Sequence, residues 1–305
     1  MIGRSAFGLG SWNTWDRMDF GDAVRLLKTA VDAGVTVFDV AHYNFGPHAE
    51  NSRTDILFGE AVRAAGITRD DYLLCGKLWL WDYPRTGFEQ QLETSLARIG
   101  VDHADLVVVG DYGDRPDVPR VVTEVAAQVR AGRIGGWGVN NWLADDLDLA
   151  CGFADREGLP GPEFAQLKYS IARRSMAEGE CYRKHFASGR LVLQASDVFE
   201  GGVLLGNSAP TRKIGADPGG IRESIVDASA ELSTIAADFG VTRAQLALAF
   251  CLAYTPVANV LFGVSRAEQL TDNLGALDLA RIHGKEVRAA VNHLWLDQDV
   301  NPDGT

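Results

Sequence analysis

Residues 34–46 read G-V-T-V-F-D-V-A-H-Y-N-F-G, a short apolar run that ends in the carboxylate of Asp39. The run follows Gly34, which ends a helical pattern, and it predicts a buried strand. A carboxylate at the end of a buried strand is costly unless it is paired or functional. The polar and aromatic loop that follows, residues 42–45, is therefore the first place to look for chemistry.

Apolar strands of this kind alternate with helices along the whole chain. The strand 105–109, D-L-V-V-V, is typical of a strand buried on both faces of a parallel sheet. Strict alternation predicts a parallel sheet with helices outside, and eight units in 305 residues predict a closed (β/α)8 TIM barrel. The expected strands are 6–10, 35–39, 72–77, 105–109, 134–139, 164–167, 191–195 and 257–262. The expected helices are 19–33, 52–64, 88–99, 118–131, 143–157, 175–188, 223–239, 243–254, 267–277 and 285–296.

The alternative architecture is an open doubly wound sheet with a G-x-G-x-x-G turn. Gly8-Leu9-Gly10 is followed by Ser11-Trp12 and not by a third glycine, so the barrel is favoured. No shift in composition marks a second domain. We expect one barrel domain over residues 1–305, with a long loop at 199–222 and a C-terminal helix and tail at 285–305.

Charge and cysteine content limit the function classes. A formal net charge of -12 disfavours nucleic acid and membrane surfaces as partners. The four cysteines have neither C-x-x-C nor metal-ligand spacing, so we expect free thiols in a reducing compartment. The first residues do not resemble a signal peptide, and the longest apolar run is too short to span a bilayer. We expect a cytoplasmic protein that binds a small-molecule substrate and no metal; a homo-oligomer is compatible with the sequence.

In such a barrel the active site lies at the carboxyl ends of the strands. Asp39 and Lys77 end neighbouring strands, so we expect them to pair. A lysine there can donate a proton, form a Schiff base or tune a third group, and the alternative is an ion pair that only closes the barrel mouth. The strand ends also nominate Ser11, Trp12, Trp79, residues 110–112, Asn140, Asn141, Gln166, Tyr169, Ser196, Asp197 and residues 263–266.

Several motifs in the right order make the chain resemble the aldo-keto reductases, and within them the branch of the potassium-channel β-subunits. The resemblance covers nearly the whole chain. Its motifs are G-V-T-V-F-D-V-A at 34–41 with Gly46-Pro47, Glu50 and F-G-E-A at 58–61; Lys77; W-G-V-N-N-W at 137–142; and V-L-F-G-V-S-R-A-E-Q at 260–269 with Asn273.

The resemblance implies NADPH-dependent reduction of a carbonyl or an imine, with the nicotinamide across the barrel mouth. It implies that Asn141 and Gln166 bind the carboxamide and that Arg266 lies near a 2′-phosphate, which a guanidinium meets as a fork. The remaining residues expected to bind NADP(H) are Ser11, Trp12, Asn140, Ser196, Gly263, Ser265, Gln269 and Asn273.

The expected proton-relay set of the family is Asp, Tyr, Lys and His, and this chain departs from it. Asp39 and Lys77 match, but the family tyrosine position, counted from Asp39, falls on Asn44. Tyr43 lies one residue early and Phe45 one residue late. The tyrosine position is therefore open between these three residues.

Gly110 stands where the family usually has the histidine. The candidates for the proton donor are Tyr43, with its pKa lowered by Lys77, and His42, whose ordinary pKa is near neutral. The residues assigned to catalysis are thus Asp39, Tyr43, Lys77 and His42. We expect an apolar pocket lined by the long loop and by Trp12, Trp79, Trp81 and Trp142.

Three functions are compatible with this sequence. The first is an NADPH-dependent reductase of a small organic molecule. The second is a cofactor-binding regulatory subunit with little turnover, as the channel-subunit likeness suggests. The third is a barrel repurposed for non-redox lyase or isomerase chemistry through Asp39, Lys77 and His42.

Overall fold

The computed structural model describes residues 2–12, 14–44, 51–210 and 214–300. Its eight strands form a closed barrel in chain order, which confirms the predicted (β/α)8 fold. The strands are β1 (Phe7–Gly10), β2 (Val37–Asp39), β3 (Leu73–Leu78), β4 (Ala104–Val109), β5 (Ile134–Asn140), β6 (Phe164–Lys168), β7 (Val192–Ser196) and β8 (Val257–Phe262). The α-helices are α1 (Phe20–Asp32), α2 (Thr54–Ala64), α3 (Phe88–Ile99), α4 (Val118–Arg130), α5 (Ala144–Glu157), α6 (Ser175–Glu178), α7 (Glu180–Ala187), α8 (Arg222–Asp238), α9 (Arg243–Leu252), α10 (Ala267–Asn273) and α11 (Gly275–Ala290).

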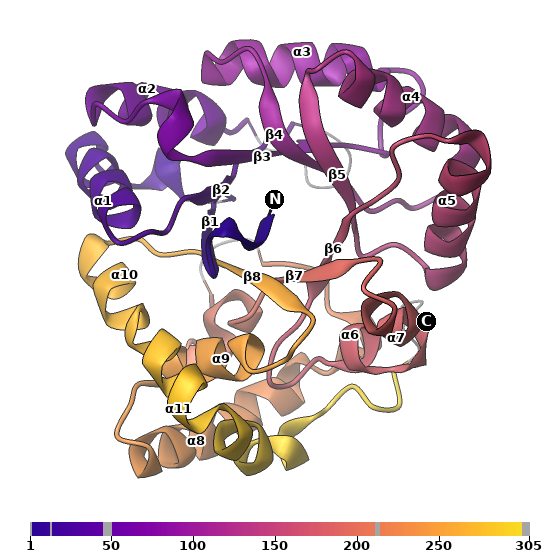
Figure 1. Cartoon of the computed structure of the whole chain (residues 1–305). Coiled ribbons are helices and arrows are strands. Elements are labelled where there is room, and N and C mark those ends of the chain that lie inside the picture. Colours follow the sequence, from indigo (N-terminus) through magenta and orange to yellow (C-terminus); the bar gives the residue numbers. More distant parts are fainter. Residues whose placement is uncertain (1, 13, 45–50, 211–213, 301–305) are drawn as a thin grey trace. The chain divides into compact units, whose positions relative to one another are not determined.

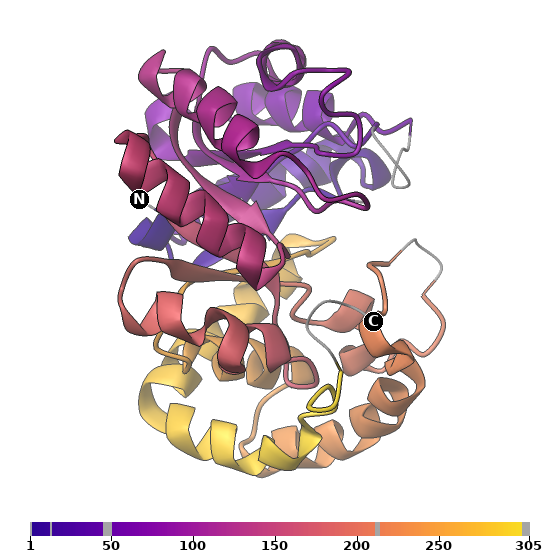
Figure 2. The same cartoon turned by 90° about the vertical axis from the view of Figure 1, so that its right-hand side faces the viewer.

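The chain divides into two compact units, Met1–Gln166 with Gly263–Ala267, and Leu167–Phe262 with Glu268–Thr305. The single domain expected from the sequence stays a prediction. In the first unit, helices α1 to α5 lie outside strands β1 to β5 (Figure 1), and α4 and α5 lie side by side (Figure 2). The register pairs Asp39 with Gly10 on one side and with Cys75 on the other, so Lys77 lies two residues further along β3.

Close helix packing in the first unit depends on a glycine. A Cβ atom at Gly59 on α2 would lie 1.9 Å from the carbonyl oxygen of Ile99, the last residue of α3. Only glycine therefore permits these two backbones to approach so closely. Strand β4 is buried from Leu106 to Val109, as its continuous apolar run predicts.

Three expected helices, at 175–188, 267–277 and 285–296, differ from those in the structure. The helix expected at 175–188 breaks into α6 and α7 at Gly179, whose backbone is extended and where a Cβ would lie 2.3 Å from Ser175 O. The C-terminal helix α11 begins at Gly275, not at residue 285, and the preceding α10 ends at Asn273. Helix α11 has a kink at His283, and buried residues lie on both sides of it, Ala276 and Leu279 before it and Gly284 and Val287 after it.

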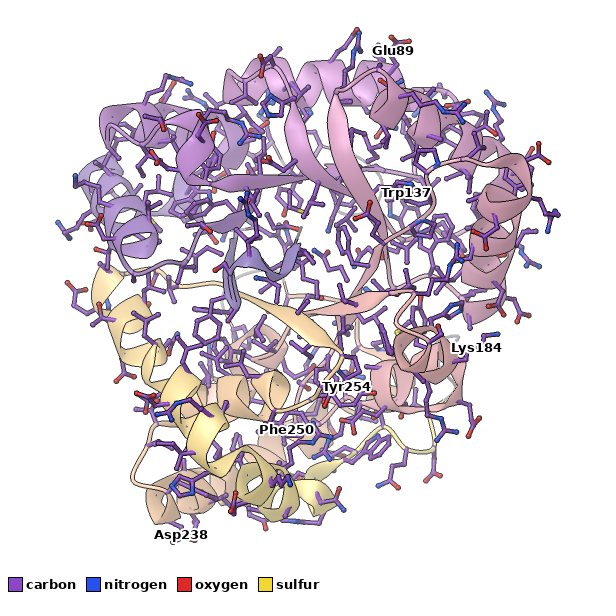
Figure 3. All side chains as sticks on the ribbon, in the orientation of Figure 1. Glu89, Trp137, Lys184, Asp238, Phe250 and Tyr254 are labelled. Atoms are coloured by element: carbon purple, nitrogen blue, oxygen red, sulfur yellow. The ribbon has the colours of Figure 1, made fainter. Side chains whose placement is uncertain are left out.

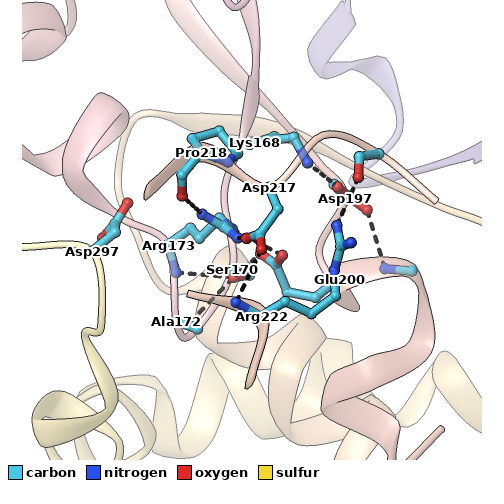
Figure 4. A network of polar contacts seen from close by, with 12 residues as sticks. Lys168, Ser170, Ala172, Arg173, Asp197, Glu200, Asp217, Pro218, Arg222 and Asp297 are labelled. Atoms are coloured by element: carbon cyan, nitrogen blue, oxygen red, sulfur yellow. Dashed lines mark hydrogen bonds and ion pairs between the residues drawn. The ribbon is translucent and has the colours of Figure 1, made fainter. Parts of the chain in front are cut away.

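The long loop at 199–222 contains two 3-10 turns, η5 (Glu200–Leu205) and η6 (Pro218–Gly220), and a buried polar network holds it (Figure 4). The Arg173 guanidinium, 3% exposed, donates to Glu200 Oε2 at 3.0 Å, to Pro218 O at 2.6 Å and to Asp217. Burial, and then the nearby Asp197 carboxylate, raise the pKa of Glu200. Arg173 thus attaches the loop to the segment that follows β6.

The neighbouring Arg174 attaches a different segment. Its guanidinium donates to Ile171 O and Val291 O and lies 4.5 Å from the centre of the Phe250 ring. Phe250 and Tyr254 lie close together on α9 and just after it (Figure 3). Asp297 accepts the backbone N–H of Arg174 at 2.9 Å, so the C-terminal segment is held on the chain after β6.

The described helices include no single helix that is long and apolar enough to cross a membrane. Helices α8 and α9 pass that test of length and composition only as a pair bent by 85°.

Candidate active site

Asp39, the last residue of β2, is 3% exposed and lies beside Gln166 of β6. Gln166 Nε2 donates to Asp39 Oδ2 at 2.8 Å, and Lys77 Nζ donates to Gln166 Oε1 at 3.1 Å. The expected direct pair is wrong: among the ion pairs of the described residues, none joins Asp39 to Lys77. The neutral amide of Gln166 lies between the Asp39 carboxylate and the Lys77 ammonium. Its nitrogen donates to the carboxylate, and its oxygen accepts from the ammonium.

The backbone of Gln166 is fixed by the end of β5. Asn140 Nδ2 and the Asn141 N–H both donate to Gln166 O, each at 3.1 Å. Asn141 adopts a left-handed backbone conformation with φ 50°, which asparagine tolerates better than most residues. Both asparagines therefore support the residue that links Asp39 with Lys77.

Tyr43 is buried, and Ser11 Oγ donates to its hydroxyl at 3.5 Å. Burial, followed by the charge of Asp39, raises the pKa of Tyr43 well above its usual value, and the hydrogen bond from Ser11 acts in the opposite direction. The expectation that the pKa of Tyr43 is lowered is wrong, because burial of the phenol outweighs the other influences. Of the other candidates for the tyrosine position, Asn44 lies beside His42, and Phe45 lies outside the described residues.

His42 is half-buried, and Asn44 Nδ2 donates to its Nε2. Burial, and then the Arg98 guanidinium, lower the pKa of His42, while the Asp55 carboxylate opposes them. The neutral imidazole is therefore favoured near pH 7.

Trp79, just after β3, fills the space beside Gly110. A Cβ at Gly110 would lie 3.3 Å from Trp79 Cε3 and 3.3 Å from Leu78 O. The indole ring is 5.8 Å from the Tyr43 ring at an angle of 63°, and Lys77 Nζ lies 5.4 Å from the ring centre. The Trp79 indole thus lies beside Gly110, the position at which the family usually has a histidine.

The tryptophans expected to line a pocket separate into two groups. Trp12 and Trp81 pack on the cluster of Ala41, Tyr43 and Trp79. Trp142 is fully buried and donates its Nε1–H to Gly110 O at 2.9 Å. It therefore supports the backbone at Gly110 and does not line the site.

The residues expected to bind the adenosine end lie after β8. Gly263, Ser265 and Arg266 are exposed, and Arg266 forms no ion pair with any carboxylate in the described part of the chain. Gln269 is partly buried and Asn273 is buried on α10. Ser196, at the end of β7, donates to Leu167 O at 2.9 Å.

One residue of the site could not be identified from the sequence. Gln91 of α3 is 4% exposed, accepts the Trp79 N–H at 2.7 Å, and donates to Trp79 O at 3.0 Å and Thr86 O at 2.9 Å. A lone glutamine on a helix carries no signal of such a role. No group of three His, Cys, Asp or Glu side chains among the described residues is placed to hold a metal ion.

Comparison with known proteins gives consistent matches. The model of the aldo/keto reductase family matches residues 6–294. A probable voltage-gated potassium channel subunit beta of Oryza sativa subsp. japonica is 31% identical over 310 residues, covering 93% of this chain and 90% of that protein. The protein of the same description in Arabidopsis thaliana is 28% identical, covering 90% and 88%. The crystal structure of an aldo-keto reductase from Klebsiella pneumoniae in complex with NADPH has the same fold, with a TM-score of 0.74, 24% identity, and coverage of 95% and 91%.

Proposed function

The chain belongs to the aldo/keto reductase family, and on that premise we propose that it is an NADP(H)-dependent oxidoreductase. The reaction is reduction of a carbonyl, or of an imine, of a small organic molecule by hydride transfer. The observation that carries this proposal is the connected set of Asp39, Gln166 and Lys77 at the carboxyl ends of β2, β6 and β3. That is the end of a barrel at which enzymes of this fold place their chemistry.

The chain offers suitable groups for NADP(H). Arg266 is exposed and no described carboxylate neutralises it, which suits a guanidinium that binds the 2′-phosphate. We assign Ser265, Gln269 and Asn273 to the same end, and Asn141 and Gln166 to the carboxamide. NADPH, when bound, supplies the hydride. The Klebsiella pneumoniae aldo-keto reductase, which shares the fold, binds NADPH.

In this proposal Tyr43 delivers the proton. Its raised pKa keeps the phenol protonated across the physiological range, and the alkoxide formed by hydride transfer is basic enough to take that proton. A positioned acid contributes roughly 10²–10⁴-fold to such a step. Lys77 supplies positive charge beside the developing alkoxide, and Asp39 orients Lys77 through Gln166. His42, as a neutral imidazole, contributes hydrogen bonding and not charge.

Stopped-flow oxidation of NADPH with a panel of aldehydes, ketones and imines tests the proposal. We expect wild type to bind NADPH and turn over members of the panel, whereas Tyr43→Phe loses roughly 10²-fold or more in the hydride step at unchanged NADPH affinity. Tyr72→Phe is the matched control, because Tyr72 packs on Phe38 and Phe58 away from Lys77. Tight NADPH binding without turnover of any panel member would contradict the proposal.

The likeness to probable channel subunits favours one second candidate, a regulatory subunit that binds NADP(H) with little turnover. It predicts a stable complex with a partner protein. Affinity purification of the full chain with and without NADPH, followed by light scattering of any complex, distinguishes the two candidates. Fast turnover together with a free chain would exclude the regulatory role.

A further inference from the structure

Trp79 contacts several residues at which this site departs from the family pattern. Its indole faces the side-chain-free Gly110, and its Nε1–H donates to His42 O at 3.0 Å. The Tyr43 ring and the Lys77 ammonium both contact the same indole. Two of the four residues proposed for catalysis thus share one aromatic neighbour.

The indole has little freedom to move. The buried Gln91 side chain holds both the N–H and the carbonyl of Trp79, and the hydrogen bond to His42 O fixes the edge of the ring. A buried amide that satisfies three backbone groups is costly to disturb, because each group would lose its partner away from water. The ring is therefore a fixed surface for the groups that contact it.

The contacts of the ring suit an ammonium and a phenol. The face of an indole attracts a cation, and a T-shaped contact with a second ring is favourable. The missing side chain at Gly110 leaves the ring the room for this position, because a Cβ there would already crowd Trp79 Cε3 at 3.3 Å.

We propose that Trp79 is a positioning residue, whose indole holds the Lys77 ammonium and the Tyr43 phenol in place for proton delivery, in space that Gly110 leaves open. The inference rests on the proposed function for its catalytic consequence. Its structural part, the contact between Trp79 and Lys77, can be tested without measuring turnover.

The first experiment reads Lys77 directly and needs no cofactor. The chain has only six lysines, so the side-chain resonances of isotope-labelled lysine are resolvable, and loss of one set in Lys77→Arg assigns Lys77. A group over an indole face shows an upfield ring-current shift. We expect Trp79→Leu to abolish this shift, Trp79→Phe to keep a reduced shift, and Gly110→Ala to alter it by crowding the ring.

The second experiment measures turnover in the same variants. We expect Trp79→Leu to lower kcat roughly 10-fold or more with NADPH affinity unchanged, and Trp79→Phe to recover most of that loss. Trp295→Leu is the matched control: Trp295 packs on Arg174 and donates to Ser175 Oγ at 3.1 Å, so its loss should leave the Lys77 resonances and the turnover in place.

Unchanged Lys77 resonances in Trp79→Leu would overturn the inference. If that variant does not fold, Gly110→Ala decides in its place, and unchanged resonances there would have the same meaning. A ring-current shift in wild type without any NADPH turnover would instead remove the proposed function and leave the contact with Trp79 intact, so the two failures are distinguishable.

Discussion

Replacement of Gln166 by methionine tests the link between Asp39 and Lys77. Methionine has a similar volume and flexibility, so the change removes the hydrogen bonds to Asp39 and Lys77 without opening a large cavity. Gln166 is 2% exposed and Asp39 is 3% exposed, so the carboxylate cannot replace its lost donor with bulk water. Lys77 is only partly buried, and its ammonium can rehydrate.

These exposures give the size of the effect. A hydrogen bond to a charged group contributes about 1.5–3 kcal/mol, and a buried acceptor left without a donor costs about 1–3 kcal/mol. Because the Lys77 side recovers part of its loss in water, we expect Gln166→Met to lower the free energy of unfolding by about 2–4 kcal/mol. The assay is urea unfolding followed by both tryptophan fluorescence and circular dichroism, since coincident transitions are needed for a two-state free energy.

The matched control is Gln128→Met on α4. Gln128 is 8% exposed, but its Oε1 accepts no hydrogen bond from the described residues. We expect this change to cost less than about 1 kcal/mol. A second variant, Gln166→Glu, places a carboxylate beside Asp39 in place of the lost donor, so it should also lower the free energy of unfolding at pH 7. A loss below about 0.5 kcal/mol in Gln166→Met would refute the bridge.

Three further predictions follow from burial and close contact. Burial lowers the pKa of His42, so its contribution to stability is complete above the unfolded pKa near 6.5 and is lost as the pH falls. In His42→Gln the melting temperature should therefore depend less on pH between 7 and 5 than in wild type. A dependence as steep as that of wild type would contradict this. Gly59→Ala should cost about 1–3 kcal/mol or more in urea unfolding, because its Cβ meets a backbone oxygen at 1.9 Å, whereas Gly87→Ala, with nothing within 4 Å, should be nearly neutral. Arg173→Met should cost about 3–5 kcal/mol at pH 7 and less as the pH falls, because burial raises the pKa of Glu200 and favours its neutral form; a deficit independent of pH would exclude that explanation.

The fold could be predicted because its signals are local. Helix α3 begins and ends where its sequence period predicts, and Gly100 takes the left-handed conformation that ends it. Thr242 caps α9 as expected, and Gln245 completes the capping box. The prediction was wrong where tertiary contacts override local periodicity, as at Gly284, whose missing side chain lets α11 approach Ala253 after α9.

The site was predictable as a set of strand ends and not as a set of contacts. Asp39 and Lys77 could be named from the sequence, but the bridge between them comes from Gln166, 127 residues from Asp39. The pairing of Trp79 with Gly110 is equally non-local, because a glycine gives no indication of which distant ring fills its place. Register and close packing determine such contacts, and a single sequence reports neither directly.

The hold of Gln91 on Trp79 has a consequence for redesign. The indole beside Lys77 is anchored by a helix of the outer layer, while the intervening residues 80–87 connect β3 to that helix. The exposed residues of this segment, Pro84 and Arg85, can therefore be varied while Gln91 keeps Trp79 in place. Substitution of Gln91 itself would remove the hydrogen bonds that fix Trp79. The effects of the other substitutions could then no longer be compared with one another.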